Sequence, residues 1–144
     1  MEYILKNIPA YEQANTQLNQ ASQQYQSEVE AKAKEAEALY KEYQKPRLPC
    51  RPHRKRKEKK RLVAKEKEAA ELRKKYFGPE GEMAKKQEAL IAPIQDKIYE
   101  AVKQISEQKG YAAVVDRGSA QSIIFASPSI DISNEVLSRL GYSN

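Results

Sequence analysis

Apolar residues recur every three or four positions between Tyr11 and Tyr43, and this spacing constrains the fold more than any other feature of the sequence. The positions are Tyr11, Ala14, Leu18, Ala21, Tyr25, Val29, Ala33, Ala36, Leu39 and Tyr43. A mean spacing of about 3.6 residues predicts one α-helix with a narrow apolar stripe, which can pack against a single partner helix. Residues 10–45 of such a helix would extend about 54 Å, so we expect it to project from a small domain.

A second helical segment supplies the partner. Pro46, Pro49 and Pro52 end the first helix, because proline lacks a backbone donor and disfavours helix in the residue before it. Helical periodicity returns at Leu62 and continues to Ile105. The sequence therefore predicts an antiparallel helical hairpin whose second arm is interrupted by the "GPEG" stretch at residues 78–81, with Pro93 as a second bend.

The chemistry of the chain changes after Gly110. The stretches "YAAVVD" (111–116) and "SIIFAS" (122–127) are predicted to be two short strands joined by a glycine-containing turn. Residues 131–141 then predict a helix that is capped by Asp131 or Ser133 and stops at Gly141. Two strands alone are only marginally stable, so we expect further strands to come from other copies of the chain. The apolar residues that require burial there are Val114, Val115, Ile123, Ile124 and Phe125.

Positive charge is concentrated in one short run. Residues 45–61 hold ten of the 26 lysines and arginines but one of the 20 acidic residues, so the rest of the chain has a small negative net charge. The overall excess of +6 and the pI near 9.3 are therefore local properties. The candidate basic-tip residues are Arg51, Arg54, Lys55, Arg56, Lys57, Lys59, Lys60 and Arg61. A nucleic-acid patch is one interpretation, and attraction to anionic lipid headgroups or acidic polypeptides is the other.

Residues capable of catalysis or metal binding are sparse. Cys50 and His53 have a spacing found in zinc sites, but a structural zinc ion needs four ligands and no second pair follows. The sequence has no glycine-rich phosphate loop and no nucleophile elbow. We therefore expect no enzyme activity, no catalytic residues, no metal and no cofactor.

Several literal stretches resemble the Skp/OmpH family of periplasmic outer-membrane-protein chaperones, particularly its Bacteroidetes-type members. They are "EYILKNIPAYEQAN" (2–15), "VAKEKEAAELRKKYFGPEGE" (63–82), "PIQDKIYEAVKQISEQKGY" (93–111) and "FASPSIDISNEVLSRLGY" (125–142). The resemblance implies a homotrimer in which a small β-rich body carries long helical arms. It further implies an ATP-independent holdase that keeps unfolded outer-membrane proteins from aggregating in a cavity between the arms.

The resemblance and the residue patterns together predict an α+β fold. A long antiparallel, coiled-coil-like helical hairpin would project from a small β-rich trimerisation body with a C-terminal helix. We expect a segment leading into the body at residues 1–10, the arm at 11–92 with its tip at 45–61, and a return helix with the remaining body at 93–144. Val114, Val115, Ile123, Ile124 and Phe125 are the expected trimerisation residues.

Aromatic residues near the arm have two interpretations. Nine tyrosines and no tryptophan occur in the chain, and those on the arm stripes would mainly fill the seam of the hairpin. The second interpretation is that Tyr40, Tyr43, Tyr76 and Phe77 also contact a captive client chain. The expected partners are thus unfolded outer-membrane proteins, two further copies of the chain and, at the tip, anionic lipid headgroups, but no nucleic acid.

Two departures from the family pattern bear on these expectations. The chain begins at Met1-Glu2-Tyr3, where the family has a signal peptide and a first strand, so both are expected to be absent from this sequence although the location is periplasmic. The run 45–62 replaces the usual Ala/Glu/Lys composition, through either compensating frame shifts or a divergent tip. The rival function is a coiled-coil scaffold or nucleic-acid-associated protein that uses residues 45–61.

Overall fold

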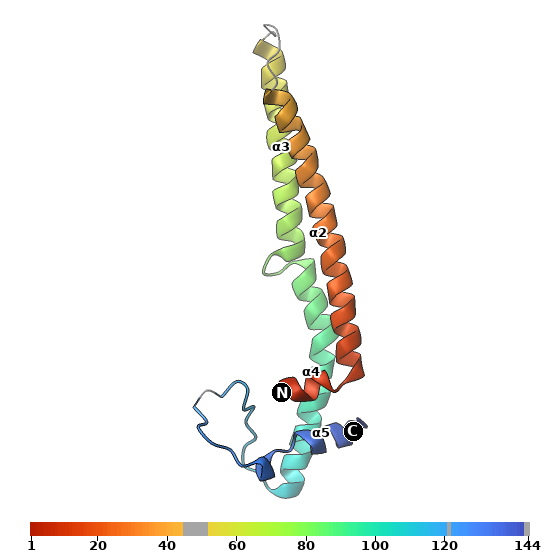
Figure 1. Cartoon of the computed structure of the whole chain (residues 1–144), viewed down its shortest axis with the longest axis vertical. Coiled ribbons are helices and arrows are strands. Elements are labelled where there is room, and N and C mark those ends of the chain that lie inside the picture. The colour runs from red at the N-terminus through yellow and green to blue at the C-terminus, as the bar shows by residue number, and fades with distance from the viewer. Residues whose placement is uncertain (45–51, 121, 143–144) are drawn as a thin grey trace. The chain divides into compact units, whose positions relative to one another are not determined.

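The structure is a computed structural model that describes residues 1–44, 52–120 and 122–142, with the side chains of residues 52–55 outside the description. Figure 1 shows the order of the elements along the chain. The helices are α1 (Glu2–Lys6), α2 (Pro9–Gln44), α3 (Pro52–Phe77), α4 (Glu82–Lys109), the 3-10 turn η1 (Pro128–Ile130) and α5 (Ser133–Arg139). The chain divides into two compact units, one made of residues 1–17 and 87–144 and the other of residues 18–86.

The unit of residues 18–86 is an antiparallel helical hairpin, as predicted. α2 runs alongside α3 (Figure 1). The ion pair of Glu35 with Lys65 and the ring contact of Tyr25 with Tyr76 join the two helices at separate levels. The buried apolar side chains of this unit are Ala21, Ala36 and Leu62. Small residues on the stripe of α2 allow close approach of the partner helix, which explains why one narrow stripe is enough.

α3 begins at Pro52, well before Leu62, where apolar periodicity returns. Proline is favourable at the first position of a helix, and lysine and arginine are good helix formers. Residues 53–61 contain no apolar residue, so the periodic pattern alone misses this part of the helix. The basic segment 52–61 is therefore helical backbone.

The predicted interruption at residues 78–81 is confirmed, because α3 ends at Phe77 and α4 begins at Glu82. The Gly78 amide donates to the Lys74 carbonyl at 2.8 Å, and the Gly81 amide donates to the Gly78 carbonyl at 2.9 Å. Gly81 is buried. The connection is thus a short turn in which Gly78 and Gly81 both make backbone hydrogen bonds.

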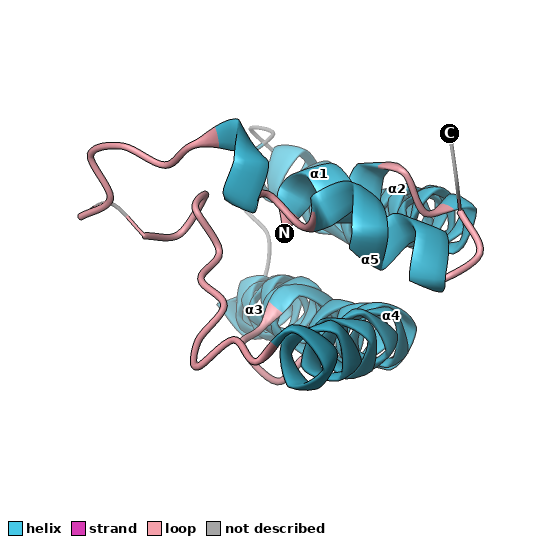
Figure 2. Cartoon of the chain, turned by 90° about the horizontal axis from the view of Figure 1, so that it is seen from below, coloured by secondary structure: helices cyan, strands magenta, loops and turns pink. Residues whose placement is uncertain are grey.

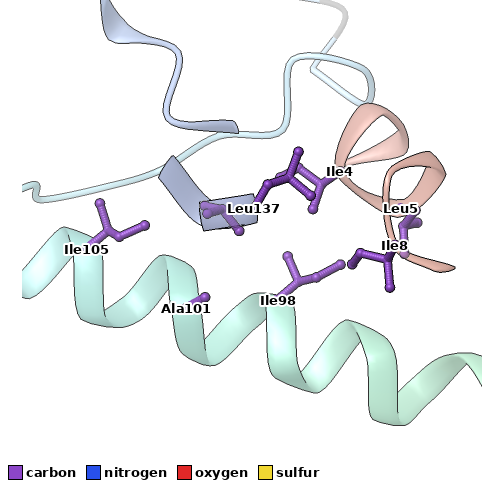
Figure 3. Packing of buried hydrophobic residues seen from close by; sticks show 8 residues of the cluster. Ile4, Leu5, Ile8, Ile98, Ala101, Ile105 and Leu137 are labelled. Carbon is purple, nitrogen blue, oxygen red and sulfur yellow. The ribbon is translucent and has the colours of Figure 1, made fainter. Parts of the chain in front are cut away.

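The other unit has the only sizeable apolar core among the described residues (Figure 3). Helices α1, α4 and α5 contribute to it, and Figure 2 shows α1 and α5 lying side by side. Its buried members are Ile4, Leu5, Ile8, Ile98, Ala101, Ile105, Val136 and Leu137. Ile98, Ala101 and Ile105 lie three or four residues apart on α4, so one face of that helix forms the floor of the core.

α5 forms within the predicted residues 131–141, but the predicted N-cap at Asp131 or Ser133 is wrong, because the N-cap is Ile132 and its side chain makes no capping hydrogen bond. The Asp131 carboxylate accepts a hydrogen bond from the Ser133 amide at 2.8 Å, at the start of the helix. Gly141 has a φ of 84°, and the Tyr142 amide donates to the Leu137 carbonyl at 2.8 Å. A glycine in the left-handed region with this backbone bond ends a helix in the Schellman manner.

The predicted α+β fold with a β-rich body is wrong, since no strand occurs among the described residues (Figure 2). Residues 111–116 and 122–127 form irregular chain with a turn at Asp116, whose carbonyl accepts from the amides of Ser119 and Ala120. Alternating and continuous apolar runs favour strands only where a neighbouring strand supplies hydrogen bonds. The described part of the chain offers no such neighbour, so this apolar pattern does not form a sheet.

Candidate functional site

A cluster of three side chains links the two helices of the hairpin beside the 78–81 turn. The rings of Tyr25 on α2 and Tyr76 on α3 are stacked, with centroids 4.1 Å apart and planes within 8° of parallel. The Tyr76 hydroxyl donates a hydrogen bond to the carboxylate of Glu28, one turn along α2 from Tyr25. All three side chains are half-buried. The seam of the hairpin is therefore aromatic and polar at this level.

The electrostatics of Tyr76 follow from these contacts. The hydrogen bond to Glu28 and partial removal from water raise the pKa of the Tyr76 phenol above its usual value, because both disfavour the phenolate. The ammonium of Lys75 lies 5.7 Å from the centroid of the Tyr76 ring, a cation–π distance. The phenol therefore remains a hydrogen-bond donor to Glu28 at neutral pH.

The expected client-contact residues fall into two places on the hairpin. Tyr76 and Phe77 lie at the end of α3, whereas Tyr40 and Tyr43 lie near the end of α2. Since Tyr25 is level with Tyr76, Tyr40 lies about 22 Å farther along the hairpin at 1.5 Å per residue. Tyr40, Tyr43 and Phe77 are 46%, 37% and 43% exposed, whereas Tyr76 is half-buried in the seam.

The exposed basic residues near the start of α3 lie at the same level of the hairpin as Tyr40 and Tyr43. The Glu35–Lys65 distance of 3.6 Å sets the register of the hairpin, which places Tyr40 and Tyr43 opposite the first helical turns of α3. Arg56, Lys57, Lys59, Lys60 and Arg61 are all exposed there. The predicted tip residues Arg51, Arg54 and Lys55 lie outside the described side chains.

Among the described residues, the ion pair of Lys65 with Glu35 crosses the hairpin, and both side chains are partly solvent-accessible. Lys65 contacts Glu68 at 2.7 Å and Glu35 at 3.6 Å, and Lys32 contacts Glu35 at 3.3 Å. The hydrogen bond between Lys65 and Glu68 raises the pKa of Lys65 and lowers that of Glu68. Solvated pairs of this kind contribute little to stability and instead leave a hydrated surface of mixed charge.

The expected trimerisation residues form an exposed apolar group in the single chain. Ile124 is 99% exposed, Phe125 81% and Val115 59%, while Val114 is 42% exposed and Ile123 half-buried. They flank the Asp116 turn in the segment between α4 and η1. Such a group of large apolar side chains is typical of an interaction surface.

Other features offer little chemistry. A shallow pocket of about 200 Å³ is lined by Tyr3, Asn134, Leu137, Ser138 and Tyr142, and the Tyr3 hydroxyl donates to Asn134 at 3.1 Å. No group of three or more His, Cys, Asp or Glu side chains gathers within the described parts of the chain. Cys50 and the His53 side chain lie outside them.

A comparison with known protein families shows to which family the chain belongs. Residues 1–140 match the family described as outer membrane protein (OmpH-like). The chain is a member of the OmpH-like family. No curated protein matches the sequence significantly.

Members of the OmpH-like family are periplasmic chaperones that bind outer-membrane proteins and form oligomers, and this is the general role of the chain. The family match covers both units, so it confirms the predicted resemblance to the family, while the resemblance to Bacteroidetes-type members stays a prediction. Within the described ranges, no helix is sufficiently long and apolar to cross a bilayer. The family is not enzymatic.

Sequence reasoning missed one part of the OmpH-like hairpin, the contact of Glu28 with Tyr76. Glu28 is one of many acidic residues on α2, and nothing in its local sequence distinguishes it from an ordinary solvated carboxylate. Its position three residues after Tyr25 was the available signal, since both side chains then lie on one face of the helix.

Proposed function

We propose that this chain is an ATP-independent holdase, which as a homotrimer encloses unfolded outer-membrane proteins between its helical hairpins and prevents their aggregation. The observation that carries the proposal is the OmpH-like match over residues 1–140, on a chain in which residues 18–86 form a long hairpin with exposed aromatic rings. The hairpin presents a large surface while burying few of its own residues, which suits a protein that encloses another chain.

Client contact is assigned to the exposed rings of Tyr40, Tyr43 and Phe77, together with the accessible part of Tyr76. A tyrosine or phenylalanine ring offers apolar area without requiring a particular partner sequence. Each contact is weak, but three hairpins present many at once, and multivalency converts them into retention that still allows release. The mixed charges of α2 and α3 keep the rest of the surface hydrated, so the client is held without being locked.

Self-association is assigned to Val114, Val115, Ile123, Ile124 and Phe125. Exposure of Ile124 and Phe125 in one chain leaves apolar surface in water that a second and third copy would cover. Burial of such surface stabilises an interface by about 25 cal/mol for each Å² of apolar area. Assembly is necessary to the mechanism, because one hairpin cannot enclose a client.

The basic residues from Arg56 to Arg61 are assigned to anionic lipid headgroups. Clustered lysine and arginine are attracted to negatively charged membrane surfaces, and the nearby rings of Tyr40 and Tyr43 suit the interfacial region of a bilayer. This contact would hold the chaperone near the membrane that receives its clients. The rival scaffold or nucleic-acid function is not favoured, because the family match already accounts for the hairpin.

Aggregation of an unfolded client tests the holdase. An outer-membrane β-barrel protein is diluted from denaturant with and without the chain, in the absence of nucleotide, and light scattering is followed. We expect suppression of scattering at a ratio near three chains to one client, with no change on addition of ATP. Unchanged aggregation would count against the proposal.

Substitution then locates the contacts. We expect the triple variant Tyr40→Ala, Tyr43→Ala, Phe77→Ala to suppress scattering less well while retaining its helical content. Tyr99→Ala serves as the matched control, since Tyr99 is 65% exposed on α4 and belongs to none of the assigned sets. Equal loss in the control would mean that exposed aromatic area in general, and not these rings, holds the client.

A further inference from the structure

The contacts of Tyr76 with Tyr25 and Glu28 form an arrangement that goes beyond the client contact assigned to the accessible part of Tyr76. Two phenol rings are parallel with centroids 4.1 Å apart, and one phenol donates its proton into a hydrogen bond with a carboxylate. No other stacked pair of rings occurs among the described residues. Packing alone requires neither feature, because an apolar pair would fill the same seam.

We propose that Tyr25 and Tyr76 form an oxidative cross-linking site, where a one-electron oxidant derived from a peroxide joins the two rings through their ortho carbons. The product would be a dityrosine bond between α2 and α3 within one chain. The proposal stands on the geometry of the hairpin and does not depend on the holdase activity.

The chemistry balances with a peroxide as the electron acceptor. Each phenol loses one electron and its hydroxyl proton and becomes a neutral phenoxyl radical. The two radicals couple by forming one carbon–carbon bond, and the two ortho hydrogens move to the phenol oxygens as the rings regain aromaticity. The protein loses two electrons and two protons in total, and one peroxide is reduced by them at its oxygen–oxygen bond.

Glu28 gives Tyr76 an advantage over the other tyrosines. An oxidised phenol becomes strongly acidic, so its oxidation is easier where a base already accepts its proton. The Glu28 carboxylate holds that position. The ammonium of Lys75 lies 5.7 Å from the ring and opposes a positively charged radical, but it does not oppose the neutral radical that remains after proton transfer to Glu28.

Because the rings are stacked, a radical formed on Tyr76 has Tyr25 as its nearest coupling partner. Stacking holds the ring of Tyr25 against that of Tyr76, so coupling of their ortho carbons needs a reorientation of the two neighbouring side chains. The exposed Tyr40, Tyr43 and Tyr99 have no stacked ring among the described residues. Their radicals would instead meet other molecules or be reduced.

A cross-link at this place would fasten the hairpin. It would close the chain between residues 25 and 76, which includes the whole of the basic segment and most of α3. A covalent closure of this length stabilises a fold by restricting the unfolded chain. We therefore expect the cross-linked hairpin to melt at a higher temperature than the unmodified one.

Photo-oxidation with a ruthenium trisbipyridyl complex and persulfate, followed by tryptic digestion, tests the site. We expect a cross-linked pair of peptides, residues 7–32 and 76–85, whose mass is the sum of the two less two hydrogen atoms. Fragmentation must assign the first position to Tyr25 and not to Tyr11, which the same peptide contains. A mixture of chains with natural and heavy nitrogen, refolded together, must give no mixed pair.

Conservative variants separate the proposal from incidental oxidation. Tyr25→Phe and Tyr76→Phe keep both rings and should abolish the pair, while Tyr99→Phe should leave its yield unchanged. Glu28→Gln keeps the shape and should lower the yield by about tenfold or more, since a base in this role usually contributes at least that factor. Random coupling among exposed tyrosines, mixed isotopic pairs, or an undiminished yield in Glu28→Gln would overturn the proposal.

Discussion

Gly81 lies against the carbonyl of Tyr76, and a β-carbon on Gly81 would come within 2.7 Å of that oxygen. The Lys75 carbonyl and the Gly78 amide nitrogen are also closer than 3.0 Å to this point. All three are backbone atoms, which cannot move aside as the end of a flexible side chain could. The turn between α3 and α4 therefore depends on glycine for space at Gly81.

We predict that Gly81→Ala destabilises the hairpin by about 1 to 3 kcal/mol, the usual cost of overpacking. Loss of helical signal on chemical denaturation, at fixed protein concentration, measures the change. Gly118→Ala is the matched control, because its β-carbon would meet only Asp116 at an ordinary distance of 3.5 Å. A cost for Gly81→Ala no larger than that of the control would contradict the proposed lack of space.

Ile105 is completely buried in the core of the unit that contains α1, α4 and α5. We predict that Ile105→Ala costs about 2 to 5 kcal/mol, because it removes apolar contacts and leaves a cavity. Ile130→Ala serves for comparison, since Ile130 is 66% exposed and should change stability by about 0.5 kcal/mol or less. Similar midpoints of denaturation for the two variants would refute the core assignment.

Asp131 makes the stability of α5 depend on pH. Hydrogen bonds from the Ser133 hydroxyl and amide hold the pKa of Asp131 below its usual value, so the folded chain favours the carboxylate. Its contribution is present above the unfolded value of about 3.9 and is lost as the pH falls through the lower folded value. We predict that Asp131→Asn destabilises the chain near pH 7 and that this cost is smaller near pH 3, below the unfolded pKa.

Thermal melting of the Asp131→Asn variant at both pH values checks this sign. At neutral pH the cost should be about 0.5 kcal/mol, the lower end of what one hydrogen bond contributes, because the carboxylate is exposed. Asp96→Asn, on the exposed side of α4, provides the control for general charge effects. A difference that stays constant between the two pH values would exclude Asp131 as the titrating group.

Ile124 and Phe125 should govern assembly. We predict that the double variant Ile124→Ser, Phe125→Ser has a lower molar mass in solution than the unsubstituted chain, because the apolar surface that drives association is removed. Light scattering coupled to size-exclusion chromatography measures the mass over a range of concentrations. Ile130→Ser removes a similarly exposed apolar side chain nearby and should leave the mass unchanged. An oligomer that survives the double variant would place the interface elsewhere.

Lys57, Lys59 and Lys60 should govern attraction to anionic vesicles. Each exposed cation near such a surface contributes about 1 kcal/mol, so replacing all three with alanine should weaken binding by about a hundredfold. Co-sedimentation with vesicles of mixed phosphatidylglycerol and phosphatidylcholine measures the effect, which should shrink as salt is added.

Three exposed lysines elsewhere provide the comparison for that vesicle experiment. Replacing Lys86, Lys97 and Lys103 with alanine removes the same charge from other faces of the chain. We expect this variant to retain most of the binding. Equal weakening in both triple variants would show that net charge, and not the basic segment of α3, attracts the vesicles.

The sequence by itself determined the helical hairpin, because the apolar stripe from Tyr11 to Tyr43 and the glycines at 78 and 81 act through local geometry. A spacing of three and four residues puts the apolar side chains on one face of any helix. Glycine weakens a helix unless other contacts compensate. α2, the turn before α4 and the end of α5 at Gly141 were therefore predicted correctly. The family could also be recognised from the sequence, because four segments of the chain resemble the family's sequences directly.

Only the tertiary structure decided what the remaining segments become and which side chains meet. The pattern of Val114, Val115, Ile123, Ile124 and Phe125 predicts strands, yet a strand needs a hydrogen-bonding neighbour, and the described part of one chain contains none. Glu28 and Tyr76 are 48 residues apart in the sequence, and only the register of α2 against α3 brings carboxylate and phenol together. Local patterns encode periodicity, whereas contacts between distant residues depend on how whole helices pack.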